Sequence, residues 1–244
     1  IASYVRYLQD NPQEVELLFK ELQIGVPSFF RDPDSWEHLK REAIPAVLAA
    51  HPDGGNLRAW SVGCSTGEEA YSLAITFKEV LEQVQPAGNF TLQIFATDLD
   101  QDAIDKARQG NYPAAIAADV SAERLQNCFI KNEGGYRVGK DIREMVTFAT
   151  QNIIMDPPFT RLDILICRNL LIYLTPELQK KLIPLFNYSL LPGGVLFLGS
   201  AESVGAFTDL FESLNIKSRL FRRRESILQF EPLLFPVSFI PAPA

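Results

Sequence analysis

The feature that most constrains the fold is an alternation of short apolar runs with segments of helical periodicity. Apolar runs typical of β-strands lie at Leu57–Val62, Leu92–Thr97, Met145–Ala149, Leu162–Cys167, Gly194–Gly199 and Leu220–Phe221. Helical spacing separates them at Gly67–Gln83, Gln101–Arg108 and Pro176–Leu190. Strands that alternate with helices predict βαβ units and an α/β fold with a mostly parallel sheet. Because the runs are almost continuously apolar, we expect helices on both faces of this sheet.

One segment interrupts the alternation. Residues 127–140, NCFIKNEGGYRVGK, predict two short strands around a Glu-Gly-Gly turn, and hence a hairpin inserted into the α/β domain. We therefore expect a helical segment and a loop at 1–50, a main domain at 51–224 and a linker or docking tail at 225–244. The inserted β-subdomain is placed at about 119–148. Because the chain starts at Ile1 inside helical spacing, we expect it to be part of a longer protein.

The composition limits the class of protein. Of the 244 residues, 47% are hydrophobic and 22% are charged, which is typical of a soluble globular domain. A net charge of −7 argues against a nucleic-acid-binding protein, which usually carries a basic face. The three cysteines show no metal-ligand spacing, so they predict no metal site but reduced thiols in a cytoplasmic protein. The sequence shows neither a signal peptide nor an apolar run long enough for membrane insertion.

The loop that follows the first predicted strand has the spacing G-x-x-x-G, from Gly63 to Gly67, and ends on two acids. This spacing fits neither a dinucleotide-binding fingerprint nor a P-loop. A helix N-terminus attracts anions, but Glu68 and Glu69 would repel a pyrophosphate from this one. For either glutamate, complementing the helix dipole and binding a ligand are equally good interpretations. The loop therefore predicts a ligand without phosphate groups.

Ligands of open parallel sheets bind beyond the carboxyl ends of the strands. Asp98 ends the second predicted strand, where its carboxylate can accept hydrogen bonds from ribose hydroxyls. The alternative role, capping the next helix, fits Asp100 better. A ligand with a ribose, an amino group and a sulfonium, but no phosphate, suits such an acidic pocket. S-adenosylmethionine meets that description.

Other polar residues are expected at the same edge. Arg31, in the loop SFFRD, can pair with a carboxylate in bidentate fashion or stack on a neighbouring Phe. Asn152 precedes the fourth predicted strand, and Arg168, Asn169 and Tyr173 follow it.

Two further features are given no role in ligand binding. The segment DPPF at 156–159 resembles a motif of methyltransferases that act on amino groups of nucleic-acid bases, but it precedes the fourth strand instead of following it. We interpret it as a turn. The two histidines, His38 and His51, are interpreted as helix-surface residues.

Five ordered motifs, GVPSFFRD, VGCSTGEEAYSLA, FATDLDQDAIDKARQGNYP, CRNLLIYL and LLPGGVLFLGSAESV, resemble the CheR family of chemotaxis protein-glutamate O-methyltransferases. The segment DPPFTRLDILICRNLLIYLTPELQKKLIPLF is most similar to the methyltransferase part of fused methylesterase–methyltransferase sensor proteins. The resemblance implies a class I S-adenosylmethionine-dependent methyltransferase fold: a Rossmann-like seven-stranded sheet whose last strand is antiparallel. It also implies a truncated N-terminal helical segment and a small inserted β-subdomain.

The resemblance also implies the site. The residues that match the family's cofactor-binding positions are Arg31, Gly63, Glu68 or Glu69, Asp98, Asn152 with Ile153, and Arg168 with Asn169. Arg31 and Tyr173 match the positions that would orient cofactor and acceptor during catalysis. One departure is Pro27, which replaces the Thr usual in the family and removes both a hydroxyl and a backbone N–H.

The implied function is methylation of glutamate side chains in the cytoplasmic domain of a chemoreceptor-like protein, with S-adenosylhomocysteine as the second product. Other domains of the parent chain would be further partners, and no nucleic acid is expected. Because of Pro27, we keep a second hypothesis: a regulatory module that binds S-adenosylmethionine or S-adenosylhomocysteine without turnover. Methylation of a nucleic acid or a small molecule is a third.

Overall fold

The computed structural model describes residue 11 and residues 27–225. Almost all of the first half of the segment predicted at 1–50 and almost all of the tail predicted at 225–244 therefore lie outside the described residues. Within the described ranges, no helix combines the length and apolar character needed to cross a membrane.

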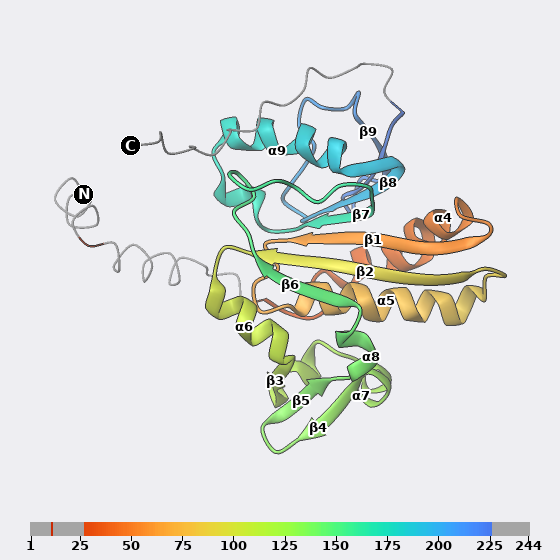
Figure 1. The fold of residues 1–244 in the computed structure, drawn as a ribbon, viewed down its shortest axis with the longest axis vertical. Helices are drawn as coiled ribbons and strands as arrows, with labels where there is room; N and C mark the ends of the chain where they lie inside the picture. The colour runs from red at the N-terminus through yellow and green to blue at the C-terminus, as the bar shows by residue number, and fades with distance from the viewer. Residues whose placement is uncertain (1–10, 12–26, 226–244) are drawn as a thin grey trace, which may run out of the picture.

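The core of the molecule is a seven-stranded sheet in the order β6-β2-β1-β7-β8-β10-β9 (Figure 1). Its strands are β1 (Gly54–Val62), β2 (Asn89–Asp98), β6 (Val146–Thr150), β7 (Leu162–Cys167), β8 (Leu190–Leu198), β9 (Phe211–Asn215) and β10 (Leu220–Arg223). The first five pair in parallel, whereas β10 runs antiparallel to both β8 and β9. The prediction of a seven-stranded sheet with an antiparallel last strand is confirmed.

Helices cover both faces of this sheet, as the apolar strands predict. On one face lie α3 (Pro33–His38), the π-helical turn η1 (Leu39–Ala43), α4 (Ile44–Ala49), α5 (Glu68–Val84) and α6 (Gln101–Gln109). The other face is covered by α9 (Pro176–Ser189) and by the loop that joins β6 to β7 (Figure 1). All six residues of β7 are buried because Ile164 and Ile166 pack on the first face while Leu165 and Cys167 pack on the second.

A second, three-stranded sheet in the order β3-β5-β4 lies between α6 and β6 in the chain. It consists of β3 (Asn111–Pro113), β4 (Phe129–Asn132) and β5 (Gly135–Val138), and it is accompanied by η2 (Ala114–Ala118), α7 (Ala122–Cys128) and α8 (Lys140–Arg143). Strands β4 and β5 form the predicted hairpin around Glu133 and Gly134. The short strand β3 is an addition that the sequence pattern does not reveal.

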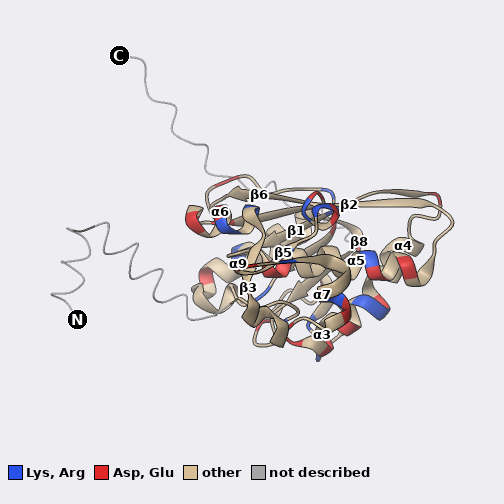
Figure 2. Cartoon of the chain, turned by 90° about the horizontal axis from the view of Figure 1, so that it is seen from below, with Lys and Arg blue, Asp and Glu red and all other residues tan. Residues whose placement is uncertain are grey.

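Charged residues are distributed in keeping with this architecture. Lys and Arg lie interspersed with Asp and Glu along the helices in the view of Figure 2, and the strands of the main sheet are largely uncharged. The described chain shows no single basic side in this view, which agrees with the acidic net charge of −7.

The register of the parallel strands brings their carboxyl ends to one edge of the sheet. Val62 of β1 pairs with Thr97 of β2, and Asp98 pairs with Thr150 of β6. On the other side, Cys167 of β7 pairs with Leu198 of β8. The loops that follow β1, β2, β6, β7 and β8 therefore meet at one edge, which we call the carboxyl edge.

Candidate functional site

The loop from Gly63 to Gly67 joins β1 to α5 at the carboxyl edge. The backbone N–H groups of Gly63 and Cys64 donate to the carbonyl of Thr97 at 2.7 and 2.9 Å, which fixes the loop against the end of β2. Gly67 has a φ of +94°, and a Cβ there would lie 2.9 Å from the Cβ of Ala107. Glycine is thus required at Gly67 by both its backbone conformation and the close approach of α6.

Glu68 and Glu69 begin α5 side by side and have different surroundings. The hydroxyl of Thr66 donates to both carboxylate oxygens of Glu68, at 2.7 and 3.0 Å, and burial raises the pKa of this carboxyl above its usual range. Among the charges that act on it is Asp119, in the inserted segment. Glu68 is therefore satisfied locally, at the N-terminus of its own helix.

Glu69 instead lies among the charged residues of the carboxyl edge. Its Oε1 accepts a hydrogen bond of 3.0 Å from the hydroxyl of Ser61, and its Oε2 lies 4.0 Å from Nη1 of Arg168. Burial raises the pKa of Glu69 to about 7, while the positive charges of Arg168 and Arg31 oppose this rise. Of the two glutamates, Glu69 is therefore the one placed to meet a cationic group of a ligand.

Asp98 connects the loops after β1 and β2. Its Oδ2 accepts from the backbone N–H of Ser65 at 2.7 Å, and its Oδ1 accepts from the N–H of Asp100 at 3.0 Å. A carboxylate offers about four acceptor positions, so both oxygens retain capacity for hydroxyl donors. Asp100 caps α6 by accepting from the N–H groups of Asp102 and Ala103, as its position in the sequence predicts.

The loop after β6 carries Asn152 and Ile153 next to Asp98. The N–H of Gln151 donates to the carbonyl of Asp98 at 2.9 Å, and Asp156 accepts from the N–H of Asn152 at 2.7 Å. Asp156 thus closes a turn, and the ring of Phe159 stacks on Phe95 with centroids 4.4 Å apart. The DPPF segment is part of this connecting loop: Asp156 and Pro157 are exposed, and the partly buried Phe159 packs against the core.

The loop after β7 holds Arg168, whose side chain is only 2% exposed. Its Nη2 donates to Oδ2 of Asp32 at 2.6 Å, and its Nη1 donates to the carbonyl of Arg31 at 3.0 Å. The guanidinium also lies 4.6 Å from the ring centroid of Phe197. Arg168 therefore ties the SFFRD loop to the sheet, and among the described residues its Nε has no hydrogen-bond partner.

The SFFRD loop is anchored by its two phenylalanines. Phe29 packs edge-on against Tyr112 and Phe129 of the inserted segment, with centroids 4.9 and 5.3 Å apart. The guanidinium of Arg124 covers the ring of Phe30 at 3.8 Å. Stacking on this ring was one of the two roles considered for Arg31 from the sequence. Arg31 is exposed, and among the described residues its guanidinium has no hydrogen-bond or ion-pair partner that would divert it from a ligand.

Two acids of this site were not predicted from the sequence. Asp32 is the partner of Arg168, and Glu202 is a buried acid after β8 that accepts backbone hydrogen bonds from the loop after β7. The position of Glu202, just past the carboxyl end of a strand, is a signal that could have identified it. Tyr173, 59% exposed, ends the short helix η3 (Leu171–Tyr173) at the rim of the site.

These residues fit S-adenosylmethionine. The ligand presents an ammonium and a sulfonium, two ribose hydroxyls, a carboxylate and a purine. Glu69 offers a carboxyl for a cationic group, Asp98 offers acceptors for hydroxyls, and Arg31 offers donors for a carboxylate. Oε1 of Gln151 is a buried acceptor that lacks a donor among the described residues, so it fits an amino group of a ligand.

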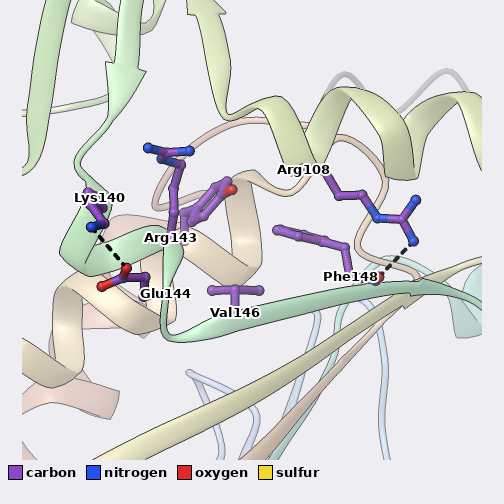
Figure 3. A pocket seen from close by; sticks show the side chains of 7 residues that line it. Arg108, Lys140, Arg143, Glu144, Val146 and Phe148 are labelled. Carbon is purple, nitrogen blue, oxygen red and sulfur yellow. Dashed lines mark hydrogen bonds and ion pairs between the residues drawn. The ribbon is translucent and has the colours of Figure 1, made fainter.

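A cavity of about 320 Å³ lies elsewhere, where the inserted segment joins the main sheet (Figure 3). Its lining consists of Tyr71, Arg108, Lys140, Arg143, Glu144, Val146 and Phe148. None of the predicted site residues lines it, so the candidate site is defined by the carboxyl edge and not by this cavity.

Several known proteins have sequences similar to this chain. An uncharacterized 104.1 kDa protein in the hypE 3' region of Rhodobacter capsulatus is 40% identical over 223 residues, which are 91% of this chain and 23% of that protein. Chemotaxis protein methyltransferase Cher2 of Pseudomonas putida is 35% identical and aligns with 75% of this chain and 68% of its own. Chemotaxis protein methyltransferase 2 of Vibrio cholerae is 32% identical, with 86% and 72% covered.

The model of the family "CheR methyltransferase, SAM binding domain" matches residues 26–220. This match includes the loops after β1, β2, β6, β7 and β8 together with the inserted segment. The chain belongs to the CheR methyltransferase family, and it carries that family's S-adenosylmethionine-binding domain.

Proposed function

We propose that the chain methylates glutamate side chains of a chemoreceptor-like signalling protein, with S-adenosylmethionine as the methyl donor and glutamate methyl esters as product. Two of the relatives described above are named chemotaxis protein methyltransferases, which supports this proposal. The cytoplasmic domain of the receptor is the proposed substrate. Other domains of the parent chain are proposed partners.

The observation that carries the proposal is a site made of carboxylates and arginines to which, among the described residues, no histidine contributes. A glutamate acceptor has a pKa of about 4.3 and is already ionised at neutral pH, so its oxygen needs no base to become nucleophilic. The chain's two histidines are bonded elsewhere, His38 to Ser218 and His51 to the carbonyl of Val47. A carboxylate acceptor therefore requires no residue of this site to remove a proton from it.

Bound S-adenosylmethionine supplies a methyl group on a positively charged sulfur, and the carbon of that methyl group is what a carboxylate oxygen can attack. The residues of the chain then have to bind the cofactor and the acceptor, orient them towards each other and exclude water. In the proposal, Glu69 faces the cofactor's ammonium, Asp98 accepts from the ribose hydroxyls, and Asn152 and Ile153 border the purine. Correct orientation of two reacting groups is worth roughly 7–11 kcal/mol of the activation barrier, so positioning alone can supply a large share of catalysis.

Arg31 and Tyr173 are the proposed catalytic residues. Arg168 donates to the carbonyl of Arg31, which fixes the backbone of that residue while its guanidinium stays available for a carboxylate. Tyr173 presents its hydroxyl at the exposed rim, where an incoming protein substrate would pass. Both side chains would orient the reacting groups and neither is required to accept a proton.

A direct test is incubation of the chain with methyl-labelled cofactor and a receptor cytoplasmic fragment, followed by mild base. Volatile labelled methanol is expected because a glutamate methyl ester hydrolyses in base. The matched control is the same fragment with its methyl-accepting glutamates replaced by alanine, which should release no methanol.

Two results would contradict the proposal. Cofactor binding by calorimetry without methanol release would favour the regulatory module, which Pro27 also suggests. A base-stable labelled product on nucleic acid or on a small molecule would favour another acceptor.

A further inference from the structure

The loop after β7 carries three residues of the proposed site, Arg168, Asn169 and Tyr173, so its shape matters for positioning. Asn169 has a φ of +58°, which is the left-handed region that most side chains avoid. A loop in this conformation needs partners for its backbone N–H groups. The N–H of Tyr173 finds a partner within the loop, the carbonyl of Leu170 at 3.1 Å. The N–H groups of Asn169 and Leu171 instead donate outside it.

Glu202 supplies these outside partners. Its Oε2 accepts from the N–H of Asn169 at 3.0 Å and from that of Gly199 at 2.7 Å, and its Oε1 accepts from the N–H of Leu171 at 2.7 Å. The residue is 4% exposed, so water does not compete for these bonds. One carboxylate thus joins the end of β8 to the loop after β7.

Gly199 makes room for this arrangement. A Cβ at Gly199 would lie 2.7 Å from Oε2 of Glu202 and 2.8 Å from the backbone N of Asn169. Distances below 3.0 Å force something to shift, and one of the two atoms belongs to the backbone. The absence of a side chain at Gly199 is therefore a condition for the carboxylate to reach its partners.

We propose that Glu202 is a positioning residue of the methyl-transfer site, whose carboxylate holds the loop from Arg168 to Tyr173 in the shape that transfer requires. This inference rests on the proposed function. In this proposal Glu202 acts through the backbone of Asn169 and Leu171, and not through a contact of its own with cofactor or acceptor. A displacement of about 1 Å can cost roughly a hundredfold in rate. Loss of the hydrogen bonds to the Glu202 carboxylate should therefore lower turnover more than it lowers cofactor affinity.

The charge of Glu202 provides a second consequence. Glu69 is surrounded by Ser61 on β1, Arg31 in the SFFRD loop, Arg168 after β7 and Glu202 after β8. The negative charge of Glu202 is among the causes that raise the pKa of Glu69, whereas the two arginines lower it. Removing the charge of Glu202 should therefore lower the pH at which Glu69 ionises.

The test compares Glu202→Gln with Glu212→Gln, which replaces an exposed glutamate on β9. In Glu202→Gln an amide NH₂ replaces one acceptor and faces backbone N–H groups. We expect kcat to fall at least tenfold, with KM for S-adenosylmethionine changed less than threefold. The midpoint of cofactor affinity against pH, measured by calorimetry, should shift to lower pH. The Glu212→Gln variant should match the wild type in all three measurements.

The inference is wrong if folded Glu202→Gln keeps wild-type kcat, whatever its pH midpoint, because the midpoint reports only the effect of the Glu202 charge on Glu69. A carboxylate that served only folding would leave kcat of the folded Glu202→Gln variant at the wild-type value, so kcat decides between the two roles. If Glu202→Gln does not fold, Gly199→Ala, which displaces the carboxylate without removing it, must show the loss of turnover. If the wild type binds cofactor but transfers no methyl group to the receptor fragment, the proposed function fails, whereas wild-type transfer with an unchanged kcat in Glu202→Gln overturns only this inference.

Discussion

In each half of the carboxyl edge, one acidic side chain accepts hydrogen bonds from the backbone N–H groups of the loops. In the half formed by β1 and β2, Asp98 accepts backbone N–H groups of Ser65 and Asp100. In the half formed by β7 and β8, Glu202 accepts from Asn169, Leu171 and Gly199. Asp98 ends β2 and Glu202 follows β8, and each accepts from the loop after a neighbouring strand as well as from the loop of its own strand.

The difference lies in what the acids have left to offer. Asp98 is 9% exposed and uses one backbone donor on each oxygen, whereas Glu202 is 4% exposed and takes three. Asp98 can therefore fix a loop and bind a ligand together, while the capacity of Glu202 goes mainly to the backbone. An acid at a strand end can thus bind a ligand or hold a loop. The number of backbone N–H groups that donate to it helps to distinguish these two roles.

The largest expected effect would come from the β7–β8 half. Arg168→Ala removes the bonds to Asp32 and Arg31 and the packing on Phe197, so we expect a loss of about 3 kcal/mol in the free energy of unfolding. Urea denaturation at constant pH measures it. Arg222→Ala, which removes a more exposed arginine 4.0 Å from Glu212, is the control and should cost less than about 0.5 kcal/mol. Equal losses of unfolding free energy in the two variants would show that Arg168 stabilises the fold no more than an exposed arginine does.

A smaller effect is expected in the β1–β2 half. In Asp98→Asn an amide group faces the N–H of either Ser65 or Asp100, so one donor is left unsatisfied at a cost of about 1–2 kcal/mol. Cofactor affinity should fall about tenfold in calorimetry. Asp100→Asn is the matched control, because asparagine caps a helix as well as aspartate does. Unchanged affinity in Asp98→Asn would remove this residue from the cofactor site.

An effect confined to one range of pH concerns Glu69, which lies between the two halves. Its folded pKa of about 7 exceeds the unfolded value near 4.5, so its contribution to stability is fully present below pH 4.5 and is lost as the pH rises towards 7. Glu69→Gln should flatten this part of the pH profile of unfolding. Affinity for the cationic cofactor should rise through pH 7 in the wild type and stay level in the variant. Glu133→Gln, in the hairpin turn, is the control, and parallel profiles for wild type and Glu69→Gln would contradict the assignment.

Much of the fold could be predicted because the strands of the main sheet carry a strong apolar signal. The predicted strand Leu162–Cys167 has the bounds of β7, and Asp98 was correctly placed at the end of β2. Strands β3 and β9 were missed because Asn-Tyr-Pro and Phe-Glu-Ser-Leu-Asn are short or polar and lie at sheet edges. Their pairing partners, not their composition, make them strands.

Residues of the candidate site could be predicted only where they directly follow a predicted strand. Arg168 and Asn169 were assigned on that basis, and the structure brings them to the same edge as Asp98. The partners of Arg168 and Glu202 could not be predicted, because Asp32 is 136 residues away from Arg168 and the donors to Glu202 are backbone groups. Backbone donors have no signature in a sequence.

The packing of Phe29 and Phe30 has a consequence for anyone who trims or recombines this domain. The three-stranded insertion resembles a removable module, yet Tyr112, Phe129 and Arg124 from that module cover both rings. Excision of residues 111–143 would therefore uncover two aromatic side chains that are now 2% and 3% exposed, next to Arg31. Chimaeras within the family should accordingly exchange the insertion and the SFFRD loop as one unit.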